Sequence, residues 1–193
     1  MTRTLILGCD AALRRTGLAL LSCDLNHPTE GQVIHSGIIS TNERHNRANR
    51  LRDLHDQMGA FLDVIGLFSD RTDFAAVEAP GPWARAHGKS SQMTVEALAQ
   101  ARAVILLALA QHGIAAMEVT TSRAKQSVAG PHATKETVQK QLKLLGLYDG
   151  GDPDIADAVT VALAGAGVQY QDAILSRAAR TPARYIKIRR KEQ

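Results

Sequence analysis

The chain has 193 residues, of which 45% are hydrophobic and 22% are charged, and its formal net charge is +4. This length and composition are typical of one globular domain with a sizeable core, and they exclude a disordered or fibrous protein. The longest purely apolar run, Ala103 to Ala110, is too short to cross a bilayer. The N-terminal residues lack the long apolar region of a signal peptide, so we expect a cytoplasmic protein without a membrane segment.

Strand-like segments come first in the chain, and strands then alternate with helices. The predicted strands are residues 4–9, 17–23, 32–39, 73–80 and 114–119, and the predicted helices are 43–68, 90–111, 120–130, 134–146 and 151–167. Short links between the first three strands predict an antiparallel meander, and the later strand–helix–strand order predicts parallel pairing. We therefore expect an α/β fold with a five-stranded mixed sheet, three antiparallel strands followed by two parallel ones, and helices on both faces.

Two predicted strands end in or near a carboxylate. Asp10 follows the first strand, and Glu78 lies at the end of the fourth. If these strands are parallel neighbours, both side chains emerge at the same edge, where ligands gather in such sheets. Asp10 is also a common turn residue, whereas a glutamate that ends a buried strand is rare unless it is paired or binds a metal.

The last predicted helix carries two more carboxylates on one face. Asp152 is the expected N-cap and Pro153 the first helical residue. Asp154 suits the first turn because the helix dipole favours an anion there. Asp157 lies three residues later in a helix that is apolar all round, so its predicted burial requires a cation.

The four carboxylates together predict a metal centre made of oxygen ligands. Such a set suits two Mg²⁺ ions, with Mn²⁺ as a substitute, rather than zinc. Two ions about 4 Å apart can activate water and stabilise the leaving oxygen in phosphodiester cleavage. The seven histidines have no cysteine partners at zinc spacing, and for Cys9 and Cys23 we favour buried free thiols over a cross-strand disulfide.

The segment GPWARAHGKSS, residues 81–91, is close to a phosphate-binding P-loop. Its two glycines are separated by six residues, whereas the P-loop requires about four, and Pro82 and Trp83 stand between them. We therefore favour a helix start with the basic residue Lys89 nearby over a nucleotide site.

The chain resembles a known family in five segments that occur in the same order. These segments are ILGCDAALRRTGLALL, AAVEAP, LAQARAVILLAL, TSRAKQSVAGPHATKETV and DIADAVTVALA. They resemble the RuvC Holliday-junction resolvases of the RNase H-like nuclease superfamily, over residues 1 to about 167. The resemblance implies an RNase H-like fold and a homodimer that binds a four-way DNA junction and makes paired nicks with Mg²⁺, with a branch-migration helicase as a possible partner.

The resemblance also assigns roles to individual residues. Its four acidic positions fall on the carboxylates named above, and its DNA-binding lysines fall on Lys125 and Lys135, which could otherwise simply be solvated. Further candidates for DNA contact are Arg123, His132, Trp83, Arg85 and Lys89. Trp83 could stack on an unpaired base or pack within its own loop. Ala11-Ala12 replaces the family's Pro-Gly, which predicts a differently built turn after Asp10, and the segment after Glu78 is longer than in the family.

The excess positive charge lies at the C-terminal end. From Arg177 onward there are seven basic residues and one acidic residue, which leaves 16 basic and 18 acidic groups in the rest of the chain. Basic tails bind phosphate backbones about as often as they are merely solvated. We predict a nuclease domain, residues 1–170, and a basic tail, residues 171–193.

The hypothesis from the sequence is a structure-selective endonuclease that resolves four-way DNA junctions in recombination and repair. The alternatives are an RNase H-like nuclease that acts on other branched DNA, flaps or RNA precursors, and a non-catalytic junction-binding protein.

Overall fold

The structure is a computed structural model, and it describes residues 3–68, 72–79 and 92–180. The strands are β1 (Thr4–Asp10), β2 (Arg15–Asp24), β3 (His27–Ser40), β4 (Phe74–Ala79) and β5 (Ala116–Thr120). The helices are α1 (Arg47–Phe68), α2 (Gln92–Gln111), α3 (Thr121–Ala129), α4 (Lys135–Leu144) and α5 (Pro153–Arg180). Every predicted strand and helix is present, in the predicted order.

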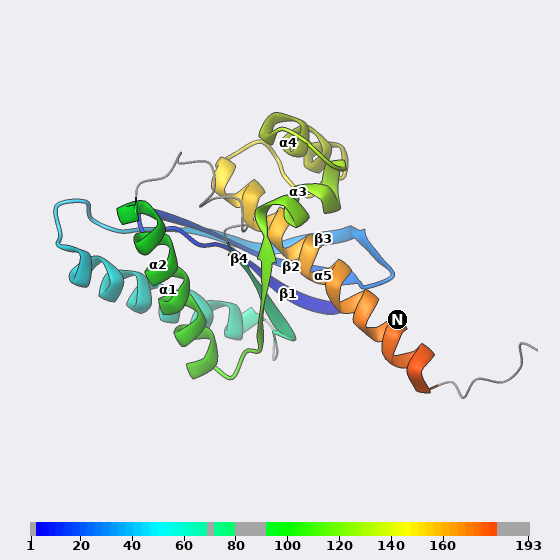
Figure 1. Cartoon of the computed structure of the whole chain (residues 1–193), viewed down its shortest axis with the longest axis horizontal. Coiled ribbons are helices and arrows are strands. Elements are labelled where there is room, and N and C mark those ends of the chain that lie inside the picture. The colour runs from blue at the N-terminus through cyan, green and yellow to red at the C-terminus, as the bar shows by residue number, and fades with distance from the viewer. Residues whose placement is uncertain (1–2, 69–71, 80–91, 181–193) are drawn as a thin grey trace, which may run out of the picture.

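The five strands form one mixed sheet in the order β3-β2-β1-β4-β5 (Figure 1). β1 pairs antiparallel with β2, and β2 pairs antiparallel with β3. β1 and β4 are parallel neighbours, as are β4 and β5. The predicted fold class is therefore confirmed, and the parallel pair β1–β4 brings the ends of those two strands to one edge.

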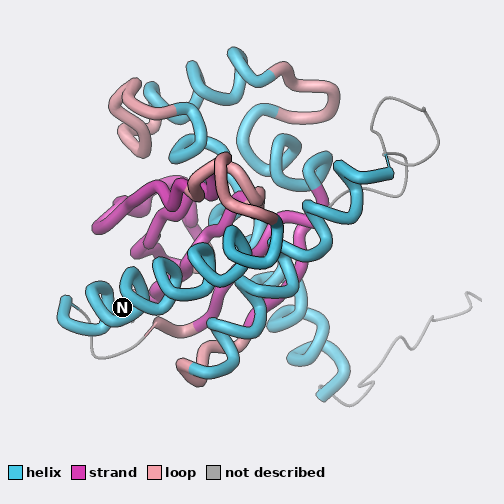
Figure 2. Tube along the Cα trace, turned by 90° about the vertical axis from the view of Figure 1, so that its left-hand side faces the viewer, coloured by secondary structure: helices cyan, strands magenta, loops and turns pink. Residues whose placement is uncertain are grey.

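Helices cover both faces of the sheet, as the tube in Figure 2 also shows. Leu7 and Cys9 of β1 pack with α1 and α2 in one hydrophobic core, whereas Ile6 packs with α4 and α5 in another. Successive strand side chains point to opposite faces, so one strand supplies both cores. Cys9 and Cys23 are free and buried, as favoured from the sequence, and burial raises the pKa of the Cys23 thiol to about 11.

Helix α2 is the one described helix long and apolar enough to cross a membrane, over residues 94–111. One side of it belongs to the protein core, because Ala101, Ile105 and Leu109 pack against α1 and the sheet. Only 22% of this segment is buried within the chain, and Leu107 is 53% exposed. A lone helix of this kind, with one side in the core, is weak support for a membrane protein. Its exposed side is mixed, with Leu107 beside polar residues such as Glu96 and Gln100.

Helix α5 is longer than predicted. The expected end at Gly167 is wrong, because the helix continues to Arg180. A Cβ on Gly165 would lie 2.7 Å from the Cβ of Ala76 on β4, so this glycine permits close helix–sheet packing instead of ending the helix. The helix therefore crosses the predicted domain boundary at residue 170, and residues 181–193 of the basic tail lie outside the described residues.

Candidate functional site

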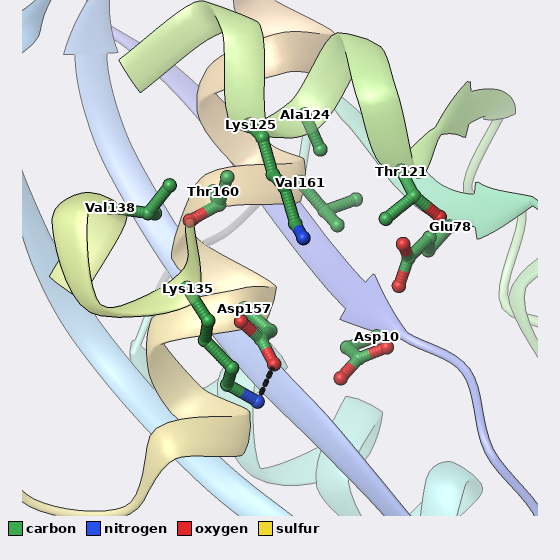
Figure 3. Close-up of a pocket in the computed structure, with 10 residues that line it drawn as sticks. All are labelled: Asp10, Glu78, Thr121, Ala124, Lys125, Lys135, Val138, Asp157, Thr160 and Val161. Carbon is green, nitrogen blue, oxygen red and sulfur yellow. Dashed lines mark hydrogen bonds and ion pairs between the residues drawn. The ribbon is translucent and has the colours of Figure 1, made fainter. Parts of the chain in front are cut away.

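Two of the four predicted carboxylates lie side by side at the edge of the sheet. The parallel ladder between β1 and β4 pairs Cys9 with Val77, and Asp10 and Glu78 are the next residue on each strand. Both line one pocket and point into it (Figure 3). The predicted meeting of two strand-end carboxylates therefore occurs.

Two glycines allow α5 to lie directly on the strands beside Asp10. A Cβ on Gly8 would lie 2.0 Å from a backbone carbonyl of α5, and a Cβ on Gly17 would lie 2.0 Å from the carbonyl oxygen of Asp154. Gly17 is also the β2 partner of Asp10. This close approach brings Asp154 and Asp157 to the end of β1, so the glycines help to build the site although they carry no functional group.

The first turn of α5 is capped as predicted. The Asp154 amide donates to Oδ1 of Asp152 at 3.0 Å, and Pro153 is the first helical residue. The Tyr148 hydroxyl donates to the carbonyl of Gly151 at 2.5 Å and so constrains the preceding loop. Asp154 is thereby fixed at the start of the helix.

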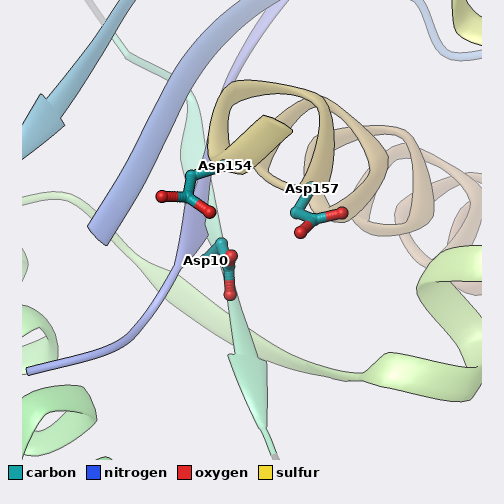
Figure 4. Close-up of side chains that lie close together, drawn as sticks. All are labelled: Asp10, Asp154 and Asp157. Atoms are coloured by element: carbon teal, nitrogen blue, oxygen red, sulfur yellow. The ribbon is translucent and has the colours of Figure 1, made fainter. Parts of the chain in front are cut away.

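Three carboxylates form a compact group of oxygen atoms. One oxygen each from Asp10, Asp154 and Asp157 lies within 4.8 Å of the others (Figure 4). Burial, a side-chain hydrogen bond with Glu78 and the charges of Glu78, Asp157 and Asp154 raise the pKa of Asp10 to about 9. At neutral pH and without a cation, Asp10 therefore holds a proton, which a bound divalent cation would displace.

Lys135 supplies the cation that the sequence required for Asp157. Its Nζ lies 2.5 Å from Oδ2 of Asp157, shown by the dashed line in Figure 3. Asp157 is less buried than predicted, since its side chain faces the pocket and is 28% exposed. Burial raises the pKa of Asp157, and the bond and charge of Lys135 oppose this.

Arg15 is a site residue that the sequence reasoning missed. Its Nε lies 2.8 Å from Oδ2 of Asp154, and its Nη2 contacts Oδ2 of Asp152. The guanidinium thus joins the first residue of β2 to the cap and first turn of α5. An arginine at the start of a strand gives no signal of its own, and its partners lie 137 and 139 residues further along the chain.

The pocket has a volume of about 270 Å³ and contains both predicted lysines. Lys125 of α3 points into it, and Lys135 of α4 lies at the carboxylates (Figure 3). Arg123 and His132 do not line it: the Arg123 guanidinium donates to Oε1 of Gln171 at 2.7 Å, and His132 occupies a turn with φ of 64°. A role for these two in DNA contact remains a prediction.

Three predicted DNA-contacting residues lie outside the described residues. They are Trp83, Arg85 and Lys89, all within residues 80–91. The same holds for the segment that is close to a P-loop.

The turn after Asp10 is built without the family's Pro-Gly. The Thr16 hydroxyl donates to the carbonyl of Ala12 at 2.7 Å and accepts from the Ala12 amide at 3.3 Å. Thr41 closes the other side by donating to the carbonyl of Leu13 at 2.5 Å. No residue from 11 to 15 has a positive φ, so glycine is not required, and alanine is compatible with this conformation.

The residues present fit a divalent cation with a preference for oxygen ligands. Three carboxylate oxygens converge, Glu78 adds a fourth carboxylate beside Asp10, and no histidine or cysteine belongs to the group within the described chain. Mg²⁺ and Mn²⁺ bind such hard ligands, whereas zinc in proteins favours nitrogen and sulfur.

Comparison with known proteins gives a consistent set of similarities. The family model described as crossover junction endodeoxyribonuclease RuvC matches residues 6–165. The protein of that name from Nitrobacter hamburgensis is 34% identical over 160 residues, which cover 82% of this chain and 86% of that protein. Its counterpart from Ehrlichia chaffeensis is 32% identical and is covered to 93% of its length.

Solved structures resemble the fold. Thermus thermophilus RuvC in complex with Holliday junction substrate superposes with a TM-score of 0.74 at 20% identity, covering 88% of this chain and 96% of that one. The yeast mitochondrial Holliday junction resolvase gives a TM-score of 0.54 at 10% identity, covering 91% of this chain and 84% of that one. At these identities the likeness concerns the arrangement of strands and helices.

Proposed function

The chain belongs to the RuvC family of crossover junction endodeoxyribonucleases, and we propose that it resolves four-way DNA junctions by metal-dependent hydrolysis of phosphodiester bonds. The observation that carries the proposal is the convergence of three carboxylates from β1 and α5 within 4.8 Å. Glu78 and two lysines line the same pocket. This arrangement combines ligands for cations with positive charge for a phosphate.

The proposed metal ligands are Asp10, Glu78, Asp154 and Asp157, and the proposed ions are two Mg²⁺, replaceable by Mn²⁺. When bound, such ions supply an activated water and stabilise the charge on the leaving oxygen. The protein's own contribution is orientation: the sheet edge holds two carboxylates and the first turns of α5 hold the other two.

The two lysines have different proposed roles. Lys135 holds Asp157 in place while the site has no metal, because its ammonium lies 2.5 Å from that carboxylate. A cation bound by that carboxylate would release Lys135 to contact DNA phosphate. Lys125 already points into the pocket (Figure 3), and both contacts would weaken as salt rises.

We also propose a homodimer, since paired nicks in a junction require two sites. The outer side of the second half of α2 supports this, because Leu107 is 53% exposed there and only 22% of residues 94–111 are buried within the chain. A branch-migration helicase as partner and a cytoplasmic location remain predictions from the sequence.

Cleavage of branched DNA tests the proposal. A synthetic four-way junction, a duplex and a flap of matched sequence are incubated with the protein and Mg²⁺, and the products are resolved on denaturing gels. We expect paired nicks in opposing strands of the junction and intact duplex and flap. Faster cleavage of the flap or of RNA would favour the alternative nuclease, and tight junction binding without cleavage would indicate a non-catalytic binding protein.

A further inference from the structure

A second cleft lies on the opposite face of the sheet from the acidic pocket. The acidic pocket is lined by residues of α3, α4 and α5, whereas this cleft of about 620 Å³ is lined by residues of α1 and α2 and by the turn that follows Asp10. Three arginines line it, Arg14, Arg47 and Arg50, and Glu43 is the only acidic residue among its described lining residues. The cleft is therefore basic.

Two helix N-termini add to the positive potential of this cleft. Arg47 is the first residue of α1, and Thr94, Ala97 and Leu98 of α2 form part of the wall. Neither helix has an acidic residue in its first turn, and both helices begin on the left in Figure 1. The N-terminal end of a helix favours an anion because its dipole is positive there. At α1 the Asn46 side chain already accepts from the Asn49 amide at 2.9 Å, which leaves the dipole and the remaining amides.

Two of the arginines can exchange their present partners for a phosphate. Arg14 pairs with Glu43, and these side chains are 74% and 55% exposed. Arg47 lies 3.6 Å from Glu96, with 38% and 49% exposure. Exposed pairs of this kind contribute little to stability, whereas a guanidinium can bind a phosphate through two parallel hydrogen bonds.

Arg50 is held in place and supports the wall of the cleft. Its Nε donates to Oγ1 of Thr41 at 3.0 Å, and its Nη2 donates to the carbonyl of Leu13 at 3.3 Å. These bonds tie α1 to the turn that also carries Arg14. The positive charges therefore stand on a fixed frame next to the end of β1.

We propose that this arginine-lined cleft binds the phosphodiester backbone of the DNA whose cleaved phosphate lies in the acidic pocket; the inference rests on the proposed function. Asp10 and Arg14 are four positions apart in the chain, so their Cα atoms lie at most about 14 Å from each other. A DNA strand carries one charge per about 3.4 Å of helix axis. The backbone that carries Arg14 is thus within a length of about four phosphates from the backbone that carries Asp10. The turn between these two residues separates the cleft from the acidic pocket.

The test is the salt dependence of junction binding. The double variant Arg14→Gln, Arg47→Gln is compared with wild type and with Arg52→Gln, an exposed arginine of α1 outside the cleft lining. Binding to a labelled four-way junction is measured over a salt series, with Ca²⁺ in place of Mg²⁺. Each lost phosphate contact lowers the magnitude of the log–log salt slope by about 0.9.

We expect the double variant to lose about 1.8 from that slope and to bind about 60-fold more weakly at about 0.1 M salt, while Arg52→Gln behaves as wild type. Unfolding midpoint and oligomeric mass should stay at their wild-type values. Unchanged affinity and slope in the double variant, with wild type binding and cutting the junction, would overturn this inference and leave the proposed function standing. Weaker binding that comes with a changed oligomeric mass would also overturn it, because the arginines would then serve assembly. A wild-type protein that neither binds nor cuts the junction would overturn the proposed function itself.

Discussion

Replacing Asp10 by asparagine should stabilise the metal-free protein at neutral and alkaline pH. The pKa of Asp10 is raised from 3.8 to about 9 by burial, by its hydrogen bond with Glu78 and by the neighbouring carboxylates. A raised pKa in the folded state means that the folded protein binds the proton more tightly than the unfolded chain. The contribution of Asp10 to folding stability is therefore fully present below pH 3.8, and it is lost as the pH rises toward 9. Asparagine cannot ionise, so the variant avoids that loss.

The magnitude follows from the difference between the two pKa values. A pH of about 7.5 is about 3.7 units above the pKa of Asp10 in the unfolded chain. At about 1.36 kcal/mol per unit, the loss of folding stability from this group is at most about 5 kcal/mol. Contact of the pocket with solvent weakens both the effect of burial and the charge repulsion that raise this pKa, so we expect a gain of about 1–3 kcal/mol. For a chain of this size that corresponds to an increase in the unfolding midpoint of about 2–12 °C.

Thermal unfolding with a chelator, at about pH 4.5, 6 and 7.5, measures the effect. The difference between Asp10→Asn and wild type should grow with pH, and Mg²⁺ should stabilise the wild type more than the variant, because a ligand stabilises the state that binds it. The control is Asp172→Asn, which changes an exposed carboxylate of α5 and should leave the midpoint unchanged. A variant that is less stable than wild type at every pH, or that gains as much from Mg²⁺, would refute the reasoning.

Three further substitutions test the geometry of the site. Gly17→Ala should lower the free energy of unfolding by about 1–3 kcal/mol and the cleavage rate by about 100-fold, because the new Cβ would lie 2.0 Å from the carbonyl oxygen of Asp154. The control is Gly66→Ala, whose new Cβ would have no atom within 4 Å. Equal effects of the two substitutions in calorimetry and cleavage would contradict the expectation. Arg15→Gln should raise the Mn²⁺ concentration for half-saturation about tenfold in a calorimetric titration, because Arg15 also binds the cap residue Asp152 and so fixes the helical turn that carries Asp154. Unchanged Mn²⁺ binding would count against this role. Lys135→Gln should bind Mn²⁺ more tightly, because the substitution removes a cation that competes for Asp157. It should bind the four-way junction about eightfold more weakly at about 0.1 M salt, because one phosphate contact is lost. A loss of affinity for both Mn²⁺ and the junction would argue for a purely structural role of the lysine.

The sheet and the carboxylates could be predicted because their signals are local. Short links and the later strand–helix–strand order determine which strands pair, and Asp10 and Glu78 stand where two buried strands end. The aspartate pair on α5 was recognisable from its three-residue spacing in an apolar helix. The family resemblance then adds the identity of the reaction to this frame.

The supporting residues could not be predicted because their roles depend on contacts between distant segments. Arg15 reaches Asp154 only when β2 and α5 are packed together. Gly8 and Gly17 are the exception among these residues, because glycines within strands are a general signal of a close approach of backbones. The end of α5 was placed too early because Gly165 serves packing against β4.

Cleavage of a four-way junction by an Asp157→Asn variant tests the central claim most directly. Single-turnover rates with Mg²⁺ are measured on a junction labelled in each strand, together with junction affinity and with Asp172→Asn as the matched aspartate control on α5. We predict paired nicks by wild type and by the control, and a rate lower by about 1,000-fold or more for Asp157→Asn with junction binding retained, because the substitution removes a ligand of the proposed metal centre. An Asp157→Asn protein that cuts the junction at the wild-type rate would contradict the assignment of the four carboxylates.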